Sequence, residues 1–220
     1  MCKYVVVDLE MCKVPKSRKT EDYRWSMETI QIGAVLLNEE YEIIDTFNTY
    51  VKPEYGMIDT YINDLTGIGK KDTLDAPMME RALQQFTEWI PSEEVKLIQW
   101  SENDKRQIQH EMFSKTINNE RFSELEESWI DCQKLFGEKL DPTKQFRLAD
   151  ALFIANVDTQ GKEHDALCDA INTAILYSKI CDNKELILNP DYESAAKEEV
   201  SHLSFSLGNL FQGINLHAIA

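Results

Sequence analysis

The chain has 220 residues, of which 43% are hydrophobic and 28% are charged, a composition that suits one globular domain with at most a short appendage. Its formal net charge of −16 excludes a protein that holds long duplex nucleic acid by coating the phosphates, because such a protein is basic. An enzyme that touches a few nucleotides, or reaches phosphates through metal ions, stays possible.

The first elements along the chain are predicted strands. Val5 to Val7 form a β-branched run within the segment Lys3 to Met11, and this run suits a central strand buried on both faces. Two more apolar segments, Ile30 to Leu37 and Ile43 to Val51, are separated by the polar turn Asn38 to Glu40. Their spacing predicts an antiparallel hairpin.

Strands and helices alternate in the rest of the predicted domain. The predicted elements are a helix at Met78 to Ile90, a strand at Val95 to Trp100, a helix from about Asn103, a strand starting within Trp129 to Phe136, and helices at Phe146 to Ala155 and Asp165 to Ile180. Grouped strands followed by this alternation predict an α/β domain with a mixed sheet.

The chain changes character beyond about Asp182. We expect one domain over residues 1–182 and a C-terminal tail over residues 183–220. Five apolar residues of the tail share one helical face, and they are Leu203, Leu207, Leu210, Phe211 and Ile214. Gly208 and Gly213 weaken that helix. We expect the tail to pack on the domain, and docking of a partner or a second copy is the alternative.

The cysteines and the apolar runs indicate a cellular compartment. The five cysteines contain no C-x-x-C pair, which favours reduced thiols over disulfides or a zinc site. Asp8 and Glu10 interrupt the apolar run near the N-terminus, so it is not a signal peptide, and no stretch is long enough to span a membrane. We therefore expect a cytoplasmic protein without membrane association.

Two carboxylates follow the apolar run of the first strand. Asp8 and Glu10 are two residues apart, so their side chains project from one face of the strand. Open α/β sheets place ligand sites at the carboxyl ends of their strands. Like charges crowded there repel one another without a cation, and hard oxygen ligands suit Mg²⁺ or Mn²⁺. A strand end with two solvated acids is the alternative.

A histidine and two further acids occur near the start of the last predicted helix. His164 follows a segment of loop character and is placed at the loop's end or in the helix's first turn, where it can approach a metal-bound water. Asp165 and Asp169 are four residues apart and share a helical face, so spacing does not choose between them as ligands. Helix capping is the structural role open to Asp165.

A fourth carboxylate is expected from the middle of the chain. Asp104 follows the predicted strand Val95 to Trp100 by four residues, and Glu102 competes with it for this role. A separate feature is the basic segment Met11 to Arg24, which carries five basic and two acidic side chains directly after Glu10. This segment is either a local funnel for single strands or a surface loop whose charges aid solubility.

Four motifs together resemble the DEDDh (DnaQ-like) exonucleases. The motifs are Val7-Asp8-Leu9-Glu10, Ile30 to Val35 (IQIGAV), Trp100 to Asp104 (WSEND) and His164 to Ala170 (HDALCDA), and they span roughly residues 3 to 181 in the family's order. The pattern from Trp100 onward is most similar to the KapD and histone-mRNA (enhanced-RNAi) exonuclease branch.

The resemblance implies a fold and a site. The implied fold is a ribonuclease H-like three-layer α/β fold with a mixed, mainly five-stranded central sheet flanked by helices. The resemblance favours Asp104 over Glu102 and Asp169 over Asp165, so the implied ligands of two Mg²⁺ or Mn²⁺ ions are Asp8, Glu10, Asp104 and Asp169, with His164 as general base.

The resemblance also implies a substrate and its contacts. The implied reaction is hydrolysis at the 3′ end of single-stranded RNA or DNA, with RNA slightly preferred, releasing nucleoside 5′-monophosphates. Leu65 and Thr66, in an L-T-G-I stretch, and Met11 are the implied substrate-binding residues. Met11 departs from the threonine common in relatives, which puts its side-chain contact, though not a backbone contact, in doubt.

Two other classes compete with this interpretation. A non-catalytic nucleic-acid or protein-binding module on the same fold does not need four crowded carboxylates and a base. A cysteine hydrolase would pair Cys12 or Cys168 with His164, but neither cysteine is accompanied by a nucleophile-elbow pattern.

Overall fold

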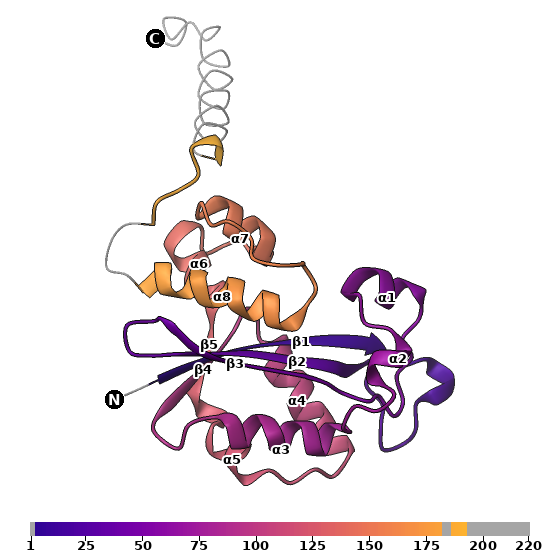
Figure 1. Cartoon of the computed structure of the whole chain (residues 1–220). Coiled ribbons are helices and arrows are strands. Elements are labelled where there is room, and N and C mark those ends of the chain that lie inside the picture. The colour runs from indigo at the N-terminus through magenta and orange to yellow at the C-terminus, as the bar shows by residue number, and fades with distance from the viewer. Residues whose placement is uncertain (1–2, 182–185, 193–220) are drawn as a thin grey trace, which may run out of the picture.

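A mixed five-stranded sheet forms the middle layer of the computed structural model, which describes residues 3–181 and 186–192 (Figure 1). The strands are β1 (Lys3–Lys13), β2 (Met27–Leu37), β3 (Ile43–Tyr50), β4 (Val95–Gln99) and β5 (Trp129–Asp131), in the order β3-β2-β1-β4-β5. β2 pairs antiparallel with β1 and β3, whereas β4 pairs parallel with β1 and β5. The predicted mixed sheet, hairpin and central first strand are confirmed.

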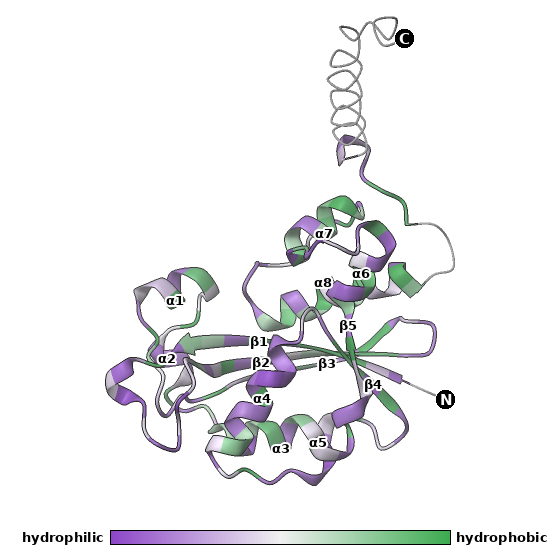
Figure 2. Ribbon diagram, turned by 180° about the vertical axis from the view of Figure 1, so that it is seen from behind, coloured by the Kyte–Doolittle hydropathy of each residue, from purple (hydrophilic) through white to green (hydrophobic). Residues whose placement is uncertain are grey.

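Helices cover both faces of this sheet (Figure 1). One layer contains α3 (Met79–Trp89), α4 (Asn103–Ser114) and α5 (Glu120–Glu124), and the other contains α6 (Cys132–Leu140), α7 (Leu148–Ile154) and α8 (Ala166–Cys181). The short helices α1 (Thr60–Thr66) and α2 (Lys70–Thr73) lie beyond the end of β1, and two 3₁₀ turns are η1 (Lys16–Arg18) and η2 (Glu126–Ser128). Figure 2 shows hydrophobic residues along the strands and the covering helices, and hydrophilic residues in the outer loops.

Alternation along β1 divides the core into two parts. Val5, Val7 and Leu9 pack in the cluster that includes α3 and α4. Val6 packs in the opposite cluster with α6, α7 and α8. Because side chains two residues apart share a face of a strand, Asp8 and Glu10 lie on the side of Val6, toward α8.

β1 extends beyond its parallel neighbour. Its pairing with β4 runs as far as Val6 and Ile98, while its pairing with β2 continues to Lys13 across an irregularity between Glu10 and Met11. The strand predicted to end at Met11 is therefore two residues longer, because β2 still supplies backbone partners. Asp8 and Glu10 lie where the paired strands fall from five to three, β1, β2 and β3, and this opens the edge of β1 on the side of β4.

Some element boundaries differ from the sequence predictions. The strand expected within Trp129 to Phe136 ends at Asp131, whose carboxylate accepts a hydrogen bond from the Lys134 backbone N–H at 2.8 Å and caps α6. The helices α1, α2 and α5 were not predicted, since segments of four to seven residues are too short to show a helical period. The nine-residue helix α6 was not predicted either, and it begins within the segment where a strand was expected.

The described residues after α8 pack on the domain. Leu186, Leu188 and Tyr192 contact the cluster that includes α7 and α8, and the Asn189 N–H donates to the Ile154 carbonyl at 2.9 Å. The apolar face predicted at 203–214, and any partner or dimer docking through it, lies outside the described residues. Among the described residues no helix is both long and apolar enough to cross a membrane, and the cytoplasmic location stays a prediction.

Candidate active site

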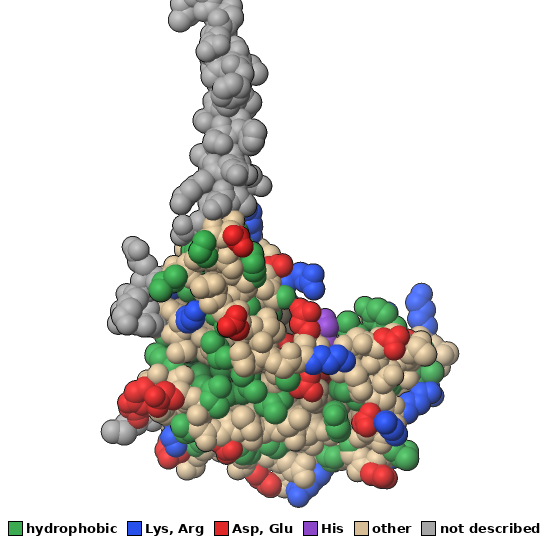
Figure 3. All heavy atoms as spheres, turned by 45° about the horizontal axis from the view of Figure 1, so that its top comes forward, with side chains coloured by type: hydrophobic (Ala, Val, Ile, Leu, Met, Phe, Trp, Pro, Cys, Tyr) green, Lys and Arg blue, Asp and Glu red, His purple; other side chains and the backbone are tan. Residues whose placement is uncertain are grey.

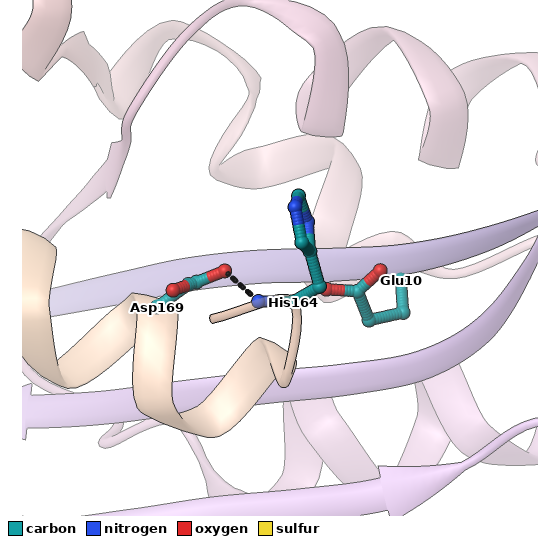
Figure 4. Close-up of side chains that lie close together, drawn as sticks. All are labelled: Glu10, His164 and Asp169. Carbon is teal, nitrogen blue, oxygen red and sulfur yellow. Dashed lines mark hydrogen bonds between the residues drawn. The ribbon is translucent and has the colours of Figure 1, made fainter. Parts of the chain in front are cut away.

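Three of the predicted site residues meet above the sheet. Glu10 from β1, His164 from the loop before α8 and Asp169 from α8 each present one ligand-type atom, and these atoms all lie within 4.8 Å of one another. Figure 4 shows the imidazole rising between the two carboxylates. The His164 backbone N–H donates to Asp169 Oδ2 at 3.0 Å, so Asp169 fixes the position of the loop that carries the histidine.

Close packing of α8 against β2 brings these residues together. Gly33 is the register partner of Asp8, and a methyl group in its place would lie 2.2 Å from the Ala166 carbonyl carbon. Only glycine permits this approach. Gln31, the partner of Glu10, accepts a hydrogen bond from the Ala166 N–H at 3.2 Å. The I-Q-I-G motif therefore holds the first turn of α8 against the D-x-E motif.

Asp165 occupies the capping position that the sequence left open to it. Its carboxylate accepts hydrogen bonds from the backbone N–H groups of Leu167 and Cys168, both at 3.1 Å. These are amide groups at the start of α8 that have no partner within the helix. Asp169, one turn later, has its carboxylate among the ligand-type atoms instead.

Asp104 and Glu102 have different surroundings. Glu102 is exposed and pairs with Arg106 one turn later on the surface of α4. Asp104 is buried, and its carboxylate accepts a hydrogen bond from the backbone N–H of Leu9, which lies beyond the last residue of β1 paired with β4. Asp104 therefore reaches the part of β1 that carries Asp8.

Asp8, Glu10, Asp104 and Asp169, which we call the acidic cluster, perturb one another. Burial raises the pKa of Asp8 well above its usual range, and the charges of Asp104, Asp169 and Glu10 raise it further. Burial, followed by Asp169 and Asp104, raises the pKa of Glu10 to about 8. Four carboxylates that resist ionisation together will take up protons or cations at neutral pH.

The two remaining members show the same trend. Burial raises the pKa of Asp104 to about 7 in spite of its backbone hydrogen bonds. Burial also raises the pKa of Asp169, although the His164 backbone N–H opposes this shift. Mg²⁺ and Mn²⁺ prefer oxygen ligands to sulfur or nitrogen ligands. A set of four carboxylates with one adjacent imidazole therefore suits these ions.

His164 has an uncommon backbone conformation. Its φ is 61°, in the left-handed region that few residues other than glycine adopt. Such a conformation costs on the order of 1 kcal/mol and persists where the surroundings impose it. Here the surroundings are the hydrogen bond to Asp169 and the packed start of α8. The histidine lies in the loop before the helix, which is one of the two positions that the sequence left open.

The cleft around these residues is visible on the molecular surface. Figure 3 shows acidic side chains and a histidine in a hollow between the side formed by α6, α7 and α8 and the lobe that carries α1. A small pocket of about 100 Å³ between α7 and the start of α8 is lined in part by Arg147, His164 and Asp169. The site therefore lies in a cleft that an extended ligand can enter.

The predicted substrate-binding residues lie around the end of α1 and β1. Thr66 is buried, and its hydroxyl donates to the Ile62 carbonyl at 2.9 Å and accepts from the Ile68 N–H at 3.0 Å, so this side chain stabilises the turn after α1. Leu65 and Met11 are half-buried. Contacts of these three residues with substrate stay predictions, and Thr66 offers its backbone more readily than its hydroxyl.

Part of the basic segment has structural partners. Arg18 donates to a backbone carbonyl at 3.2 Å, and Lys19 donates to the Arg24 carbonyl and the Ser26 hydroxyl, both at 3.0 Å. Lys13 Nζ lies 5.0 Å from the centre of the Tyr61 ring. The funnel stays a prediction, and its test is best made at Lys13, because Arg18 and Lys19 also hold the segment together.

One basic residue near the site, Lys162, was not predicted. It lies in the loop before α8, and its charge lowers the pKa of Glu10. A lysine in a polar loop has no spacing that marks it, so the sequence contained no signal for its proximity to Glu10.

The cysteines do not have the properties of nucleophiles. Burial raises the pKa of Cys12 to about 12, and burial also raises the pKa of Cys168. Both thiols are therefore protonated at neutral pH, which disfavours a cysteine hydrolase.

Comparison with known proteins agrees with this geometry. A family model described as "Exonuclease" (RNase_T) matches residues 5–177. ERI1 exoribonuclease 2 of Homo sapiens is 31% identical over 182 residues, covering 70% of this chain and 25% of that protein. The Xenopus laevis protein of the same name is 30% identical over 185 residues, covering 71% of this chain and 26% of its own length. The chain thus spans about a quarter of these relatives.

Solved structures share the fold. The nuclease domain of 3′hExo, a DEDDh family member bound to rAMP, has a TM-score of 0.70 at 22% identity and covers 85% of this chain and 96% of that one. Escherichia coli exonuclease I in complex with a dT13 oligonucleotide has a TM-score of 0.63 at 13% identity, covering 83% and 41%. The ribonuclease H-like fold expected from the sequence is confirmed.

Proposed function

The chain belongs to the DEDDh family of 3′–5′ exonucleases, and we propose that it removes nucleotides from the 3′ end of single-stranded nucleic acid, with RNA slightly preferred over DNA. The observation that carries this proposal is the acidic cluster beside His164. The relatives named exoribonucleases support the preference for RNA.

The acidic cluster would hold two divalent ions, Mg²⁺ or Mn²⁺. Once bound, such ions activate the attacking water and offset the charge that develops on the leaving 3′ oxygen. Asp8, Glu10, Asp104 and Asp169 would be ionised in that state, since the positive charges replace the protons that their raised pKa values favour.

His164 would accept the proton of the attacking water. The water oxygen forms a bond to phosphorus, and the bond from phosphorus to the 3′ oxygen of the penultimate nucleotide breaks. The 3′ oxygen takes up a proton from solvent, and a nucleoside 5′-monophosphate leaves. His164 is positioned for this by the hydrogen bond that its backbone makes to Asp169. Its side chain then returns the proton to solvent before the next cycle.

The test is digestion of matched 5′-labelled substrates. Single-stranded RNA, single-stranded DNA and duplexes of one sequence are incubated with Mg²⁺, with Mn²⁺ or with EDTA. We expect a ladder shortened from the 3′ end with either metal ion, release of nucleoside 5′-monophosphates, and no digestion with EDTA. Binding of single strands without digestion under any of these conditions would replace the proposal with a non-catalytic module.

A further inference from the structure

Lys162 extends from one wall of the cleft to the other. It precedes His164 by two residues in the loop before α8, and it is exposed. A methyl group placed on Gly67, the residue that ends α1, would lie 2.9 Å from Lys162 Nζ. The ammonium group therefore lies against the L-T-G-I turn, on the side of the cleft opposite to its own backbone.

The backbone of this lysine is held in place by α8. Gly161 has a φ of 70°, and a methyl group there would lie 2.3 Å from Cys168 Sγ. The Lys162 backbone also hydrogen-bonds Cys168. The loop is thus packed against the first turn of α8, so the reach of the lysine across the cleft follows from the fold.

The charge of Lys162 acts on the site. Burial, Asp169 and Asp104 raise the pKa of Glu10, and Lys162 lowers it. Within the described residues Lys162 forms no ion pair with a carboxylate, in contrast to Lys115, which binds Glu28 and Glu111. Its ammonium group is therefore free to bind an anionic ligand in the cleft.

The charge balance indicates which ligand this is. Two divalent ions carry as much positive charge as the four carboxylates of the acidic cluster carry negative charge. A phosphodiester that enters the loaded site brings one more negative charge, and a lysine ammonium is a suitable partner for a phosphate oxygen. Lys162 is two residues from His164, which lies beside Glu10 and Asp169, and its ammonium group lies against the turn expected beside the terminal nucleotides.

We propose that Lys162 binds a phosphate of the substrate strand within the last few nucleotides of its 3′ end and so holds that end across the cleft. This inference rests on the proposed exonuclease function. The loop before α8 would then have two roles, because it positions His164 and also contacts the substrate through Lys162.

Binding is tested with variants of the full chain. A 5′-fluorescein-labelled single strand is titrated with wild type, Lys162→Met, Lys162→Arg and the control Lys139→Met, with Ca²⁺ present, and Kd is measured by fluorescence anisotropy. Lys139 is an exposed lysine in the last turn of α6, at the end away from the site. We expect Kd to rise about tenfold for Lys162→Met, to recover largely for Lys162→Arg, and to stay unchanged for the control.

Neutral linkages identify the phosphate. The titration is repeated with strands that carry a methylphosphonate at one of the last three linkages. At the linkage that Lys162 contacts, Lys162→Met should cause no further loss of affinity, because the charge that the lysine binds is already absent. A structural role for Lys162 would weaken binding of every strand by the same factor, and that result would overturn the proposal.

Digestion assays separate this inference from the proposed function. Wild-type protein that digests single strands, together with a Lys162→Met variant of unchanged Kd and KM, would overturn the role of Lys162 alone. Wild-type protein that binds but never digests would overturn the proposed function, and the inference with it. Support for both requires a raised KM, a kcat within about threefold of wild type and the linkage-specific loss.

Discussion

Two groups of buried or half-buried carboxylates lie in this domain, and their charges are compensated in different ways. In the first, which we call the Lys115 cluster, Glu28 of β2 and Glu111 of α4 are fully buried and flank the ammonium of Lys115 at 2.7 and 2.8 Å. In the second, the acidic cluster, no member forms an ion pair with lysine or arginine among the described residues. Each group contains two buried carboxylates, and the groups differ in the source of the compensating charge.

Backbone hydrogen bonds also stabilise the two buried carboxylates of the Lys115 cluster. Glu28 accepts from the backbone N–H groups of Glu54 and Tyr55, both at 2.8 Å, and from that of Gly56. Glu111 accepts from the Thr29 N–H at 2.8 Å. Although burial alone would lower it, the pKa of Lys115 is raised, because Glu111 and Glu28 stabilise its charged form. The Lys115 cluster is complete within the chain.

The acidic cluster has no such internal counter-ion. Its members raise the pKa values of one another, and this rise is only partly offset by Lys162 at Glu10 and by His164 at Asp169. A set of acids with this arrangement destabilises the fold unless cations enter, which is expected of a site and not of a structural element. Removal of an acid should therefore have opposite effects on stability in the two clusters.

The largest effect is expected for Asp8→Asn. Exonuclease activity with Mg²⁺ should fall on the order of a thousandfold or more, since the variant lacks one of the four carboxylates proposed to hold the metal ions. The melting temperature measured with EDTA should rise, because the neutral amide removes the repulsion by Asp104 and Asp169. Single-turnover digestion and thermal unfolding measure the two effects, and a variant that keeps wild-type activity would remove Asp8 from the site.

A second large effect is expected for His164→Ala. The rate should fall by about 10² to 10⁴, the usual contribution of a general base, while the affinity for Mn²⁺ measured by calorimetry should change little. This outcome would separate the base from the ligands. If the affinity for Mn²⁺ fell as far as the rate, His164 would be a metal ligand instead, as its distance from Glu10 and Asp169 also permits.

The comparison also shows what the sequence could predict. Alternation placed Asp8 and Glu10 on one face of a central strand, and the spacing of His164 and Asp169 placed the first in a loop and the second on a helix. These conclusions depend only on how side-chain direction repeats along one strand or one helix, and local sequence is enough to show that repeat. Mixed-sheet pairing followed from the order of the elements.

Long-range contacts were not predictable in the same way. Asp104 could not be chosen over Glu102 from local spacing, because the difference depends on the Leu9 N–H, a group on another strand. The Lys115 cluster gave no signal, since Glu28 and Lys115 are 87 residues apart. Which buried charges find partners depends on tertiary structure, and this decides whether an acid is structural or available to a ligand.

Disruption of the Lys115 cluster should act on stability alone. Lys115→Met leaves Glu28 and Glu111 buried without a counter-ion and should lower the free energy of unfolding by about 3 to 5 kcal/mol. The kcat of the folded fraction should be retained. Arg106→Met is the control, because its exposed pair with Glu102 is worth at most about 1 kcal/mol. Equal effects in urea unfolding would contradict the assignment of Lys115.

The pH dependence of metal-free stability distinguishes the clusters most directly. Burial, Asp169 and Asp104 raise the folded-state pKa of Glu10 to about 8 from 4.5, so below about pH 4.5 both folded and unfolded states hold the proton and Glu10 costs nothing. As the pH rises further, the unfolded state loses its proton first. Wild type should then lose stability relative to Glu10→Gln by at most about 1.4 kcal/mol per pH unit until about pH 8.

Urea unfolding of wild type and Glu10→Gln with EDTA, at intervals between about pH 5 and pH 8, measures this difference. Saturating Mg²⁺ should reverse its sign, because metal ions bind the ionised carboxylate in the folded state and the amide binds them less well. If the two proteins kept a constant difference with EDTA, Glu10 would ionise in the fold as it does in water. The acidic cluster would then need no external cation for its stability, and the contrast with the Lys115 cluster would be one of location only.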